Sequence, residues 1–167
     1  MRENNKHTIT WLRALPLAMM LVVLTACTSI DCPLNNLVKV NLIMKNENES
    51  LQDTITISAI RASGNDTIFN SGVNISNLAI PVSYTQEEDL LQITLNDTLG
   101  NTYKDTLTIR KTNQIHFEAV DCPPNYFHTL TGITTTRHAI DSVVIKNPQI
   151  DYDSSKENIY VYFTPRN

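Results

Sequence analysis

Three cysteines, Cys27, Cys32 and Cys122, have the sequence surroundings that best define their chemistry. Leu24-Thr25-Ala26 precedes Cys27, and this pattern is typical of a lipobox, where a bacterial precursor is acylated on the cysteine and cut just before it. Residues 1–26 have the parts of an export signal: a basic start, an apolar run and small residues before the cut. The alternatives are an ordinary secretory signal that contains a cysteine, or an uncleaved anchor. The lipobox predicts a mature chain that begins at an acylated Cys27.

Acyl chains at Cys27, palmitate among them, are the predicted link to the membrane. Each buried CH₂ contributes about 0.8 kcal/mol, so the two or three chains of a bacterial lipoprotein hold a protein almost permanently. The apolar run from Ala14 to Leu24 is too short to span a bilayer comfortably as a helix. Only Asp31 is acidic just after Cys27, so the acidic run linked to surface export is missing. We therefore expect a cell-envelope protein, lipid-anchored at the outer membrane and facing the periplasm.

The other two cysteines, Cys32 and Cys122, are expected to form a disulfide. Once Cys27 is acylated they are an even pair, and an envelope compartment oxidises such pairs. Each lies in an Asp-Cys-Pro context. The alternative is a metal site formed with His116 and His128, but neither cysteine belongs to a C-x-x-C pair and the histidines lack metal-site spacing. The sequence predicts no metal.

No arrangement of residues predicts catalysis. His116 lies in an alternating stretch on the opposite face from Ile115 and Phe117, which favours a solvent-facing side chain. An envelope hydrolase would require His128 or His138 to converge with an acid or a nucleophile in a cleft. No serine has a nucleophile-elbow context, and Glu87-Glu88-Asp89 is typical of a solvated loop. We expect no catalytic residues and no cofactor.

Charge and aromatic content limit the partners. Removal of residues 1–26 leaves 10 basic and 16 acidic residues, a formal charge of −6, which argues against nucleic acid as a partner. Glycan-binding sandwiches often present exposed aromatic side chains, and the mature chain has no tryptophan. Tyr160 and Tyr162 share one face of the last strand and can form a stacking surface, although such pairs more often pack across strands.

An Asp-Thr/Ser-aliphatic triplet occurs five times. Its hydroxyl residues are Thr54, Thr67, Thr98, Thr106 and Ser142. The structural explanation is that aspartate ends a turn and a β-branched residue opens a strand. The functional explanation is that the triplet resembles the O-glycosylation acceptor motif of Bacteroidota envelope proteins. The resemblance implies modification of at least one of these hydroxyls.

Period-two alternation in short segments predicts an all-β chain of about nine strands. Residues 90–96 and 103–110 flank a turn and form the clearest hairpin, and the segment with Pro81 is expected at a sheet edge because proline donates no ladder hydrogen bond. Ile115, Phe117 and Ala119 are expected to face the core. We predict one immunoglobulin-like β-sandwich of about 7–9 strands. The alternative is a closed barrel.

The predicted organisation is a removed signal, residues 1–26, a short anchor segment, residues 27–35, and a sandwich domain, residues 36–167. Five steps of chain from Cys27 to Cys32 reach about 17 Å when extended. If Cys32 is bonded to Cys122, the domain stays within about 20 Å of the bilayer.

The chain has a lipobox, a cysteine before the first strand, Leu78-Ala79-Ile80-Pro81-Val82 in its middle, a second cysteine, the stretch from Ile140 to Pro148 and the stretch from Glu157 to Phe163. Together they resemble a family of small Bacteroidota lipoproteins known only as a domain of unknown function. The resemblance implies a compact β domain in the cell envelope and brings no activity or catalytic residues.

We therefore expect a non-enzymatic accessory or protein-interaction module. It would work through a sheet surface or edge, with the Pro81 segment and the last strand as candidate edges for an unidentified envelope protein partner. The alternative is a glycan- or small-ligand-binding lipoprotein, which requires an exposed aromatic cluster or a pocket.

Overall fold

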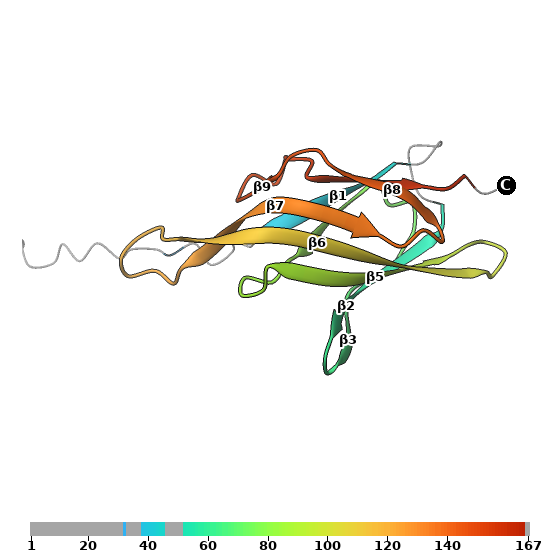
Figure 1. The fold of residues 1–167 in the computed structure, drawn as a ribbon, viewed down its shortest axis with the longest axis horizontal. Helices are drawn as coiled ribbons and strands as arrows, with labels where there is room; N and C mark the ends of the chain where they lie inside the picture. Colours follow the sequence, from blue (N-terminus) through green and yellow to red (C-terminus); the bar gives the residue numbers. More distant parts are fainter. Residues whose placement is uncertain (1–31, 33–37, 46–51, 166–167) are drawn as a thin grey trace, which may run out of the picture. The chain divides into compact units, whose positions relative to one another are not determined.

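The computed structural model describes residues 32, 38–45 and 52–165, and within these the chain is all-β (Figure 1). Two sheets contain its strands, in the orders β4-β1-β10-β8 and β3-β2-β5-β6-β7-β9. The strands are β1 Lys39–Lys45, β2 Thr54–Arg61, β3 Gly64–Gly72, β4 Asn77–Pro81, β5 Glu88–Asn96, β6 Thr102–His116, β7 Asn125–Thr135, β8 Ile140–Ile145, β9 Gln149–Ile150 and β10 Ile159–Phe163. The predicted β-sandwich is confirmed, and the barrel alternative is wrong because neither sheet closes.

Alternating burial builds the core between the sheets. Every second side chain of β1, β5 and β6 points inward, and the opposite side chains are partly or fully exposed. The buried apolar residues of these strands are Val40, Leu42, Met44, Leu91, Ile93, Leu95, Leu107 and Ile109. Because each buried aliphatic side chain contributes roughly 1.5–3 kcal/mol, this inward face fixes the register of the long antiparallel sheet.

The hairpin predicted around residues 97–102 is confirmed as the turn between β5 and β6. Asp97 accepts hydrogen bonds from the backbone N–H groups of Leu99 at 2.9 Å and Asn101 at 2.8 Å. Gly100 has a φ of +88°, in the left-handed region where a side chain would add strain. Aspartate and glycine therefore each meet a specific requirement of this turn.

Of the two segments predicted to lie at sheet edges, one does and the other does not. The Pro81 segment is β4, and it is an edge strand as expected, because in the part of the chain that the structure describes only β1 pairs with it. The last strand was expected at an edge as well, and this is wrong: β10 lies between β1 and β8. It pairs parallel with β1 through Leu42 and Ile159, and both residues are fully buried. The residues that form this ladder are far apart in sequence, so no local sequence pattern could predict their pairing.

The predicted inward face of residues 115–119 is also wrong. Ile115 and Phe117 are exposed, whereas the ring of His116 stacks on Phe127 with centroids 4.2 Å apart. The reason is that β6 is one strand of 15 residues rather than two short ones. The pairing of β6 with β7 has a register shift between Arg110 and Lys111. The residues of β6 after Lys111 extend beyond the core.

Several predicted features lie outside the described residues: the signal, Cys27 and most of the anchor segment. Within the described ranges, the structure contains no helix long and apolar enough to cross a membrane.

Candidate functional site

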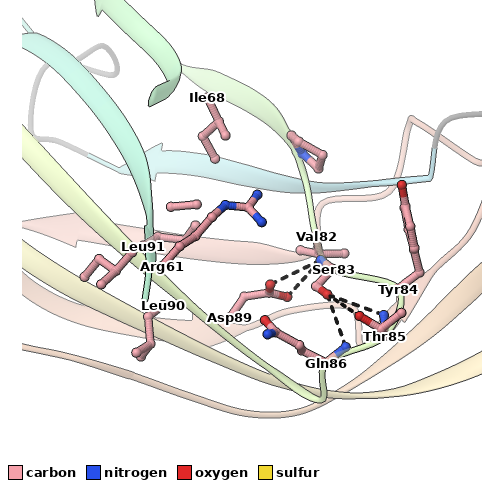
Figure 2. Close-up of a pocket in the computed structure, with 13 residues that line it drawn as sticks. Arg61, Ile68, Val82, Ser83, Tyr84, Thr85, Gln86, Asp89, Leu90 and Leu91 are labelled. Carbon is pink, nitrogen blue, oxygen red and sulfur yellow. Dashed lines mark hydrogen bonds between the residues drawn. The ribbon is translucent and has the colours of Figure 1, made fainter. Parts of the chain in front are cut away.

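A groove opens at the end of the sandwich where β1, β5 and β7 begin and β2, β4 and β6 end. It has a volume of about 310 Å³ and is lined by residues 59–61, Ile68, residues 81–86 and residues 89–91. Figure 2 shows the guanidinium of Arg61 reaching into it, with Ile68 on one side and Asp89 on the other. A second hollow of about 620 Å³ shares Pro81, Val82 and Tyr84 with it and extends to Tyr126 and His128. The two hollows share this part of their lining, and together we call them the Tyr84 groove.

Tyr84 is the most exposed side chain of aromatic type at this groove. Its side chain is 63% exposed, and its ring stacks on that of Tyr126 with centroids 5.5 Å apart and an angle of 21° between the planes. The stack joins the loop after β4 to the start of β7. One face of an aromatic ring supported in this way is available to a ligand.

The loop that carries Tyr84 is held by its own hydrogen bonds. The backbone N–H of Ser83 donates to both carboxylate oxygens of Asp89 at 3.2 Å, and Ser83 Oγ accepts from the N–H of Gln86 at 3.1 Å (Figure 2). Lys111 N donates to Glu87 O at 2.8 Å. The groove wall is therefore fixed before any ligand arrives, which reduces the entropy cost of binding.

A buried charge pair lies behind this loop. The ammonium of Lys111 is fully buried, lies 3.1 Å from Asp89 Oδ2 and donates to the carbonyl of Gln86. Position 111 continues the inward alternation of Asp105, Leu107 and Ile109 along β6, so the sheet points this lysine into the core. A buried charge requires such a partner, and here the pair ties β5 to β6 and to the loop.

His128 is the second buried polar group at this end. Its Nδ1 lies 2.8 Å from Asn113 Oδ1, which assigns the ring proton to Nδ1, and its side chain is almost completely buried in β7. Burial, and after it the positive charge of Lys111, lower the pKa of His128 to about 4 in spite of an opposing effect of Asp89. At neutral pH this imidazole is uncharged and serves as a hydrogen-bonding part of the core.

His138 lies elsewhere. Its Nδ1 is 3.1 Å from Asp105 Oδ1, and Asp105 pairs with Ile93 of β5. Asn113, the hydrogen-bond partner of His128, lies eight positions farther along β6 than Asp105. Eight residues of strand span roughly 26 Å, so the two histidines do not converge. The Asp105 carboxylate is already the acceptor for the N–H groups of Ala139 at 2.8 Å and Ile140 at 2.9 Å. It anchors the chain that enters β8.

The profile of a known family, described as a family of unknown function (DUF6452), matches residues 54–163. The chain belongs to DUF6452. No curated protein and no solved structure matches the chain. The DUF6452 match runs from β2 through β10 and includes most of the Tyr84 groove, but it begins after Cys27 and Cys32. The expected membership of a family without known function is confirmed, while its lipoprotein and Bacteroidota parts stay predictions.

The predicted disulfide is present in this DUF6452 protein: Cys32 and Cys122 are bonded to each other. The alternative metal site with His116 and His128 is therefore wrong, because both thiols are consumed and His128 is engaged with Asn113. Among the residues that the structure describes, no group of three or more His, Cys, Asp and Glu side chains could hold a metal ion.

The tyrosines of the last strand occupy a second aromatic surface. Tyr160 and Tyr162 share the outer face of the four-stranded sheet as expected, while Val161 and Phe163 are buried on the other side. Their rings meet edge to face with centroids 6.3 Å apart, and Lys45 Nζ lies 4.4 Å from the centroid of Tyr160. Because the rings meet edge to face, they form no flat platform for stacking, and Tyr84 offers the better one.

The five candidate glycosylation hydroxyls are unequally placed. Thr67 and Thr98 are exposed, whereas Thr54, Thr106 and Ser142 are half-buried. The aspartates before them have structural tasks, since Asp97 orders a hairpin turn and Asp105 is buried in β6. The tasks of Asp105 and Lys111 were missed from sequence. The signal that could have found them is alternation: if residues 102–116 are taken as a single strand, positions 105, 107, 109 and 111 all face the core.

Proposed function

We propose that this protein is a lipid-anchored, non-enzymatic interaction module of the cell envelope, whose partner binds in the Tyr84 groove. In this proposal the signal is removed after Ala26, Cys27 carries the acyl chains and the domain faces the periplasm from the outer membrane. The lipobox supports the anchor. A structural disulfide supports an oxidising compartment outside the cytoplasm.

One observation carries the choice of an interaction module: an unpaired sheet edge runs beside a preformed groove. Among the described residues, strand β4 pairs only with β1, and its last residue, Pro81, forms part of the groove wall together with Val82, which follows it. An extended segment of a partner can pair with the backbone of such an edge and place side chains in the depression beside it. Proline at position 81 and the short length of β4 limit uncontrolled pairing, so the edge is selective.

A photo-crosslinking amino acid tests this site in cells. Introduced at Arg61, which lines the groove, or at Ala79, which is exposed on β4, it should give the same defined protein adduct in isolated membranes. Val144 on β8 is the matched control, because its side chain is about half exposed but lies away from β4. Tyr84→Ala should reduce the adduct at both groove positions. An adduct of equal yield at Val144, or none at either groove position, would contradict the site.

The anchor is tested separately by mass. The intact mature protein should carry the mass of acyl chains on an N-terminal Cys27, and Cys27→Ser should move the folded domain from the membrane to the soluble fraction. A mass equal to that of the acylated polypeptide alone would also contradict glycosylation at any of the five predicted hydroxyls. An unmodified Cys27 would contradict the anchor and leave the groove proposal standing.

The second candidate is a glycan or small ligand in the same groove, and two lining residues favour it: the exposed Tyr84, with its aromatic ring, and Arg61, with its guanidinium. Oligosaccharide binding by the Cys27→Ser protein should weaken on the order of tenfold in Tyr84→Ala, as expected for loss of one stacking contact with its polar neighbours. Tyr162→Ala is the control from the other aromatic surface. Equal losses in the two variants would contradict a saccharide site at Tyr84.

A further inference from the structure

The hairpin tip between β6 and β7 has an unusual surface. Within six residues it exposes Ile115, Phe117 and Val120, whose side chains are 54, 62 and 99% exposed. Exposed apolar residues scattered singly are normal, but three close together at one tip are not. The tip is also ordered, because the N–H of Cys122 donates to Ala119 O at 3.1 Å and His116 Nε2 lies 3.1 Å from Glu118 Oε1. The apolar side chains are thus presented on a defined turn.

A covalent link ties this tip to the start of the mature chain. Cys122, two residues after Val120, is bonded to Cys32, and Cys32 lies five positions after Cys27. Five residues of extended chain span about 17 Å at most. Without the disulfide, the tip could lie anywhere that the anchor segment and domain allowed. With it, Cys122 stays within about 23 Å of Cys27, and Val120, two residues before Cys122, stays within about 30 Å.

We propose that the β6–β7 tip is a membrane-contact element, in which Phe117 and Val120 insert into the lipid surface to which Cys27 is attached. This inference rests on the proposed lipid anchor. An apolar turn held this close to acyl chains removes its own exposed surface from water by entering the headgroup and acyl boundary. The lipid surface is the occupant, because the length of chain before Cys32 ends at the acylated residue.

The charges of the tip specify the kind of surface. Glu118 and Asp121 flank the apolar residues, and the only basic group among residues 115–122 is the imidazole of His116, which pairs with Glu118. A strongly anionic lipid surface would repel this turn. The tip therefore fits a membrane of zwitterionic headgroups, which it enters by hydrophobic contact alone.

The mature chain offers a clean fluorescent test, because its sequence after Cys27 contains no tryptophan. Phe117→Trp and Val120→Trp each place a single indole at an exposed position of the tip. Leu99→Trp is the matched control: Leu99 is 82% exposed in the β5–β6 turn, at the opposite end of the 15-residue strand β6 (Figure 1). That strand separates the two turns by roughly 46 Å.

The acylated full-length mature protein is reconstituted in zwitterionic vesicles with bromine on the acyl chains. We expect emission of the two tip variants to shift to the blue and fall by about twofold relative to unbrominated vesicles, and emission of Leu99→Trp to stay unchanged. Flotation with the vesicles and the mass of the N-terminal peptide are measured on the same samples. Acylated, floating protein whose tip tryptophans are unquenched overturns the contact and leaves the anchor intact. Protein without acyl chains overturns the anchor and this inference with it.

Discussion

At the scale of single residues, two buried ionisable groups of the described part of the chain, besides the charge pair, are opposite cases. Asp105 is stabilised in its charged form and His128 in its neutral form. Burial by itself raises the pKa of Asp105, but hydrogen bonds from the backbone of Ala139, His138 and Ile140 and from the Thr136 hydroxyl outweigh burial and hold this pKa below its usual value. The pH dependence of stability should therefore carry two separate signatures.

The first signature is that of Asp105. Asp105→Asn turns an amide NH₂ toward N–H donors and should lower the free energy of unfolding by about 2–4 kcal/mol at pH 7. Because the folded pKa is lowered, the advantage of the wild type is fully present above the unfolded value near 3.8 and is lost as pH falls through the folded value. Urea denaturation from pH 2 to 7 measures this. Asp141→Asn, which changes an exposed aspartate of β8, is the control, and an equal loss there would contradict the assignment.

The second signature is that of His128, and it has a different pH window. The pKa of His128 is about 4 in the folded protein and 6.5 in the unfolded chain. Between these pH values the unfolded chain binds a proton that the folded protein does not bind. Stability should therefore fall as pH drops from about 6.5 to 4, by roughly 3 kcal/mol in total at 1.36 kcal/mol per unit. His128→Gln should flatten this slope in denaturant titrations. The slope has to survive in His116→Gln, and its loss there would assign it to the wrong histidine.

At the scale of elements, strands and turns could be predicted from sequence more readily than their neighbours. Turn chemistry and alternation predicted the β5–β6 hairpin, and the proline predicted the edge position of β4, because those signals are local. The place of β10 between β1 and β8 was not predictable, since Leu42 and Ile159 pair across 117 positions of sequence. The Tyr84 groove has the same origin: Ile68 of β3, Tyr84 of the β4–β5 loop and Tyr126 of β7 line it together although they are far apart in sequence.

The inward lysine of β6 allows a test of how elements support the groove. Lys111→Met leaves the partly buried Asp89 without its cation and should cost about 3–5 kcal/mol. Adding Asp89→Asn should restore part of the loss, and a double-mutant cycle in urea gives the coupling. Lys104→Met changes an exposed lysine of the same strand and should shift stability by less than about 0.5 kcal/mol. Strict additivity of the two groove changes would contradict a direct pair.

At the scale of the whole molecule, the groove and the β6–β7 tip belong to the same end of the sandwich. The tip closes where β6 ends and β7 begins, and the groove is lined by the starts of β1 and β7 and the end of β4. If Cys27 is acylated, this end faces the membrane. A partner must then be reached at or near the bilayer surface, which favours membrane-attached ligands over freely diffusing ones.

The disulfide is what gives this arrangement its permanence, and its energetic weight can be predicted. It closes a loop of 91 residues from Cys32 to Cys122, for which chain entropy gives about 4.5 kcal/mol of stabilisation. The double variant Cys32→Ser with Cys122→Ser should therefore unfold at a markedly lower urea concentration. It should still fold, because a domain with this buried core retains part of a typical 5–15 kcal/mol. The control is the wild type in reductant, which keeps both cysteines and lacks only the bond between them. Its free energy of unfolding should match that of the double variant. A double variant as stable as the oxidised protein would mean that the bond constrains the unfolded chain little, and that the tip owes its position to packing instead.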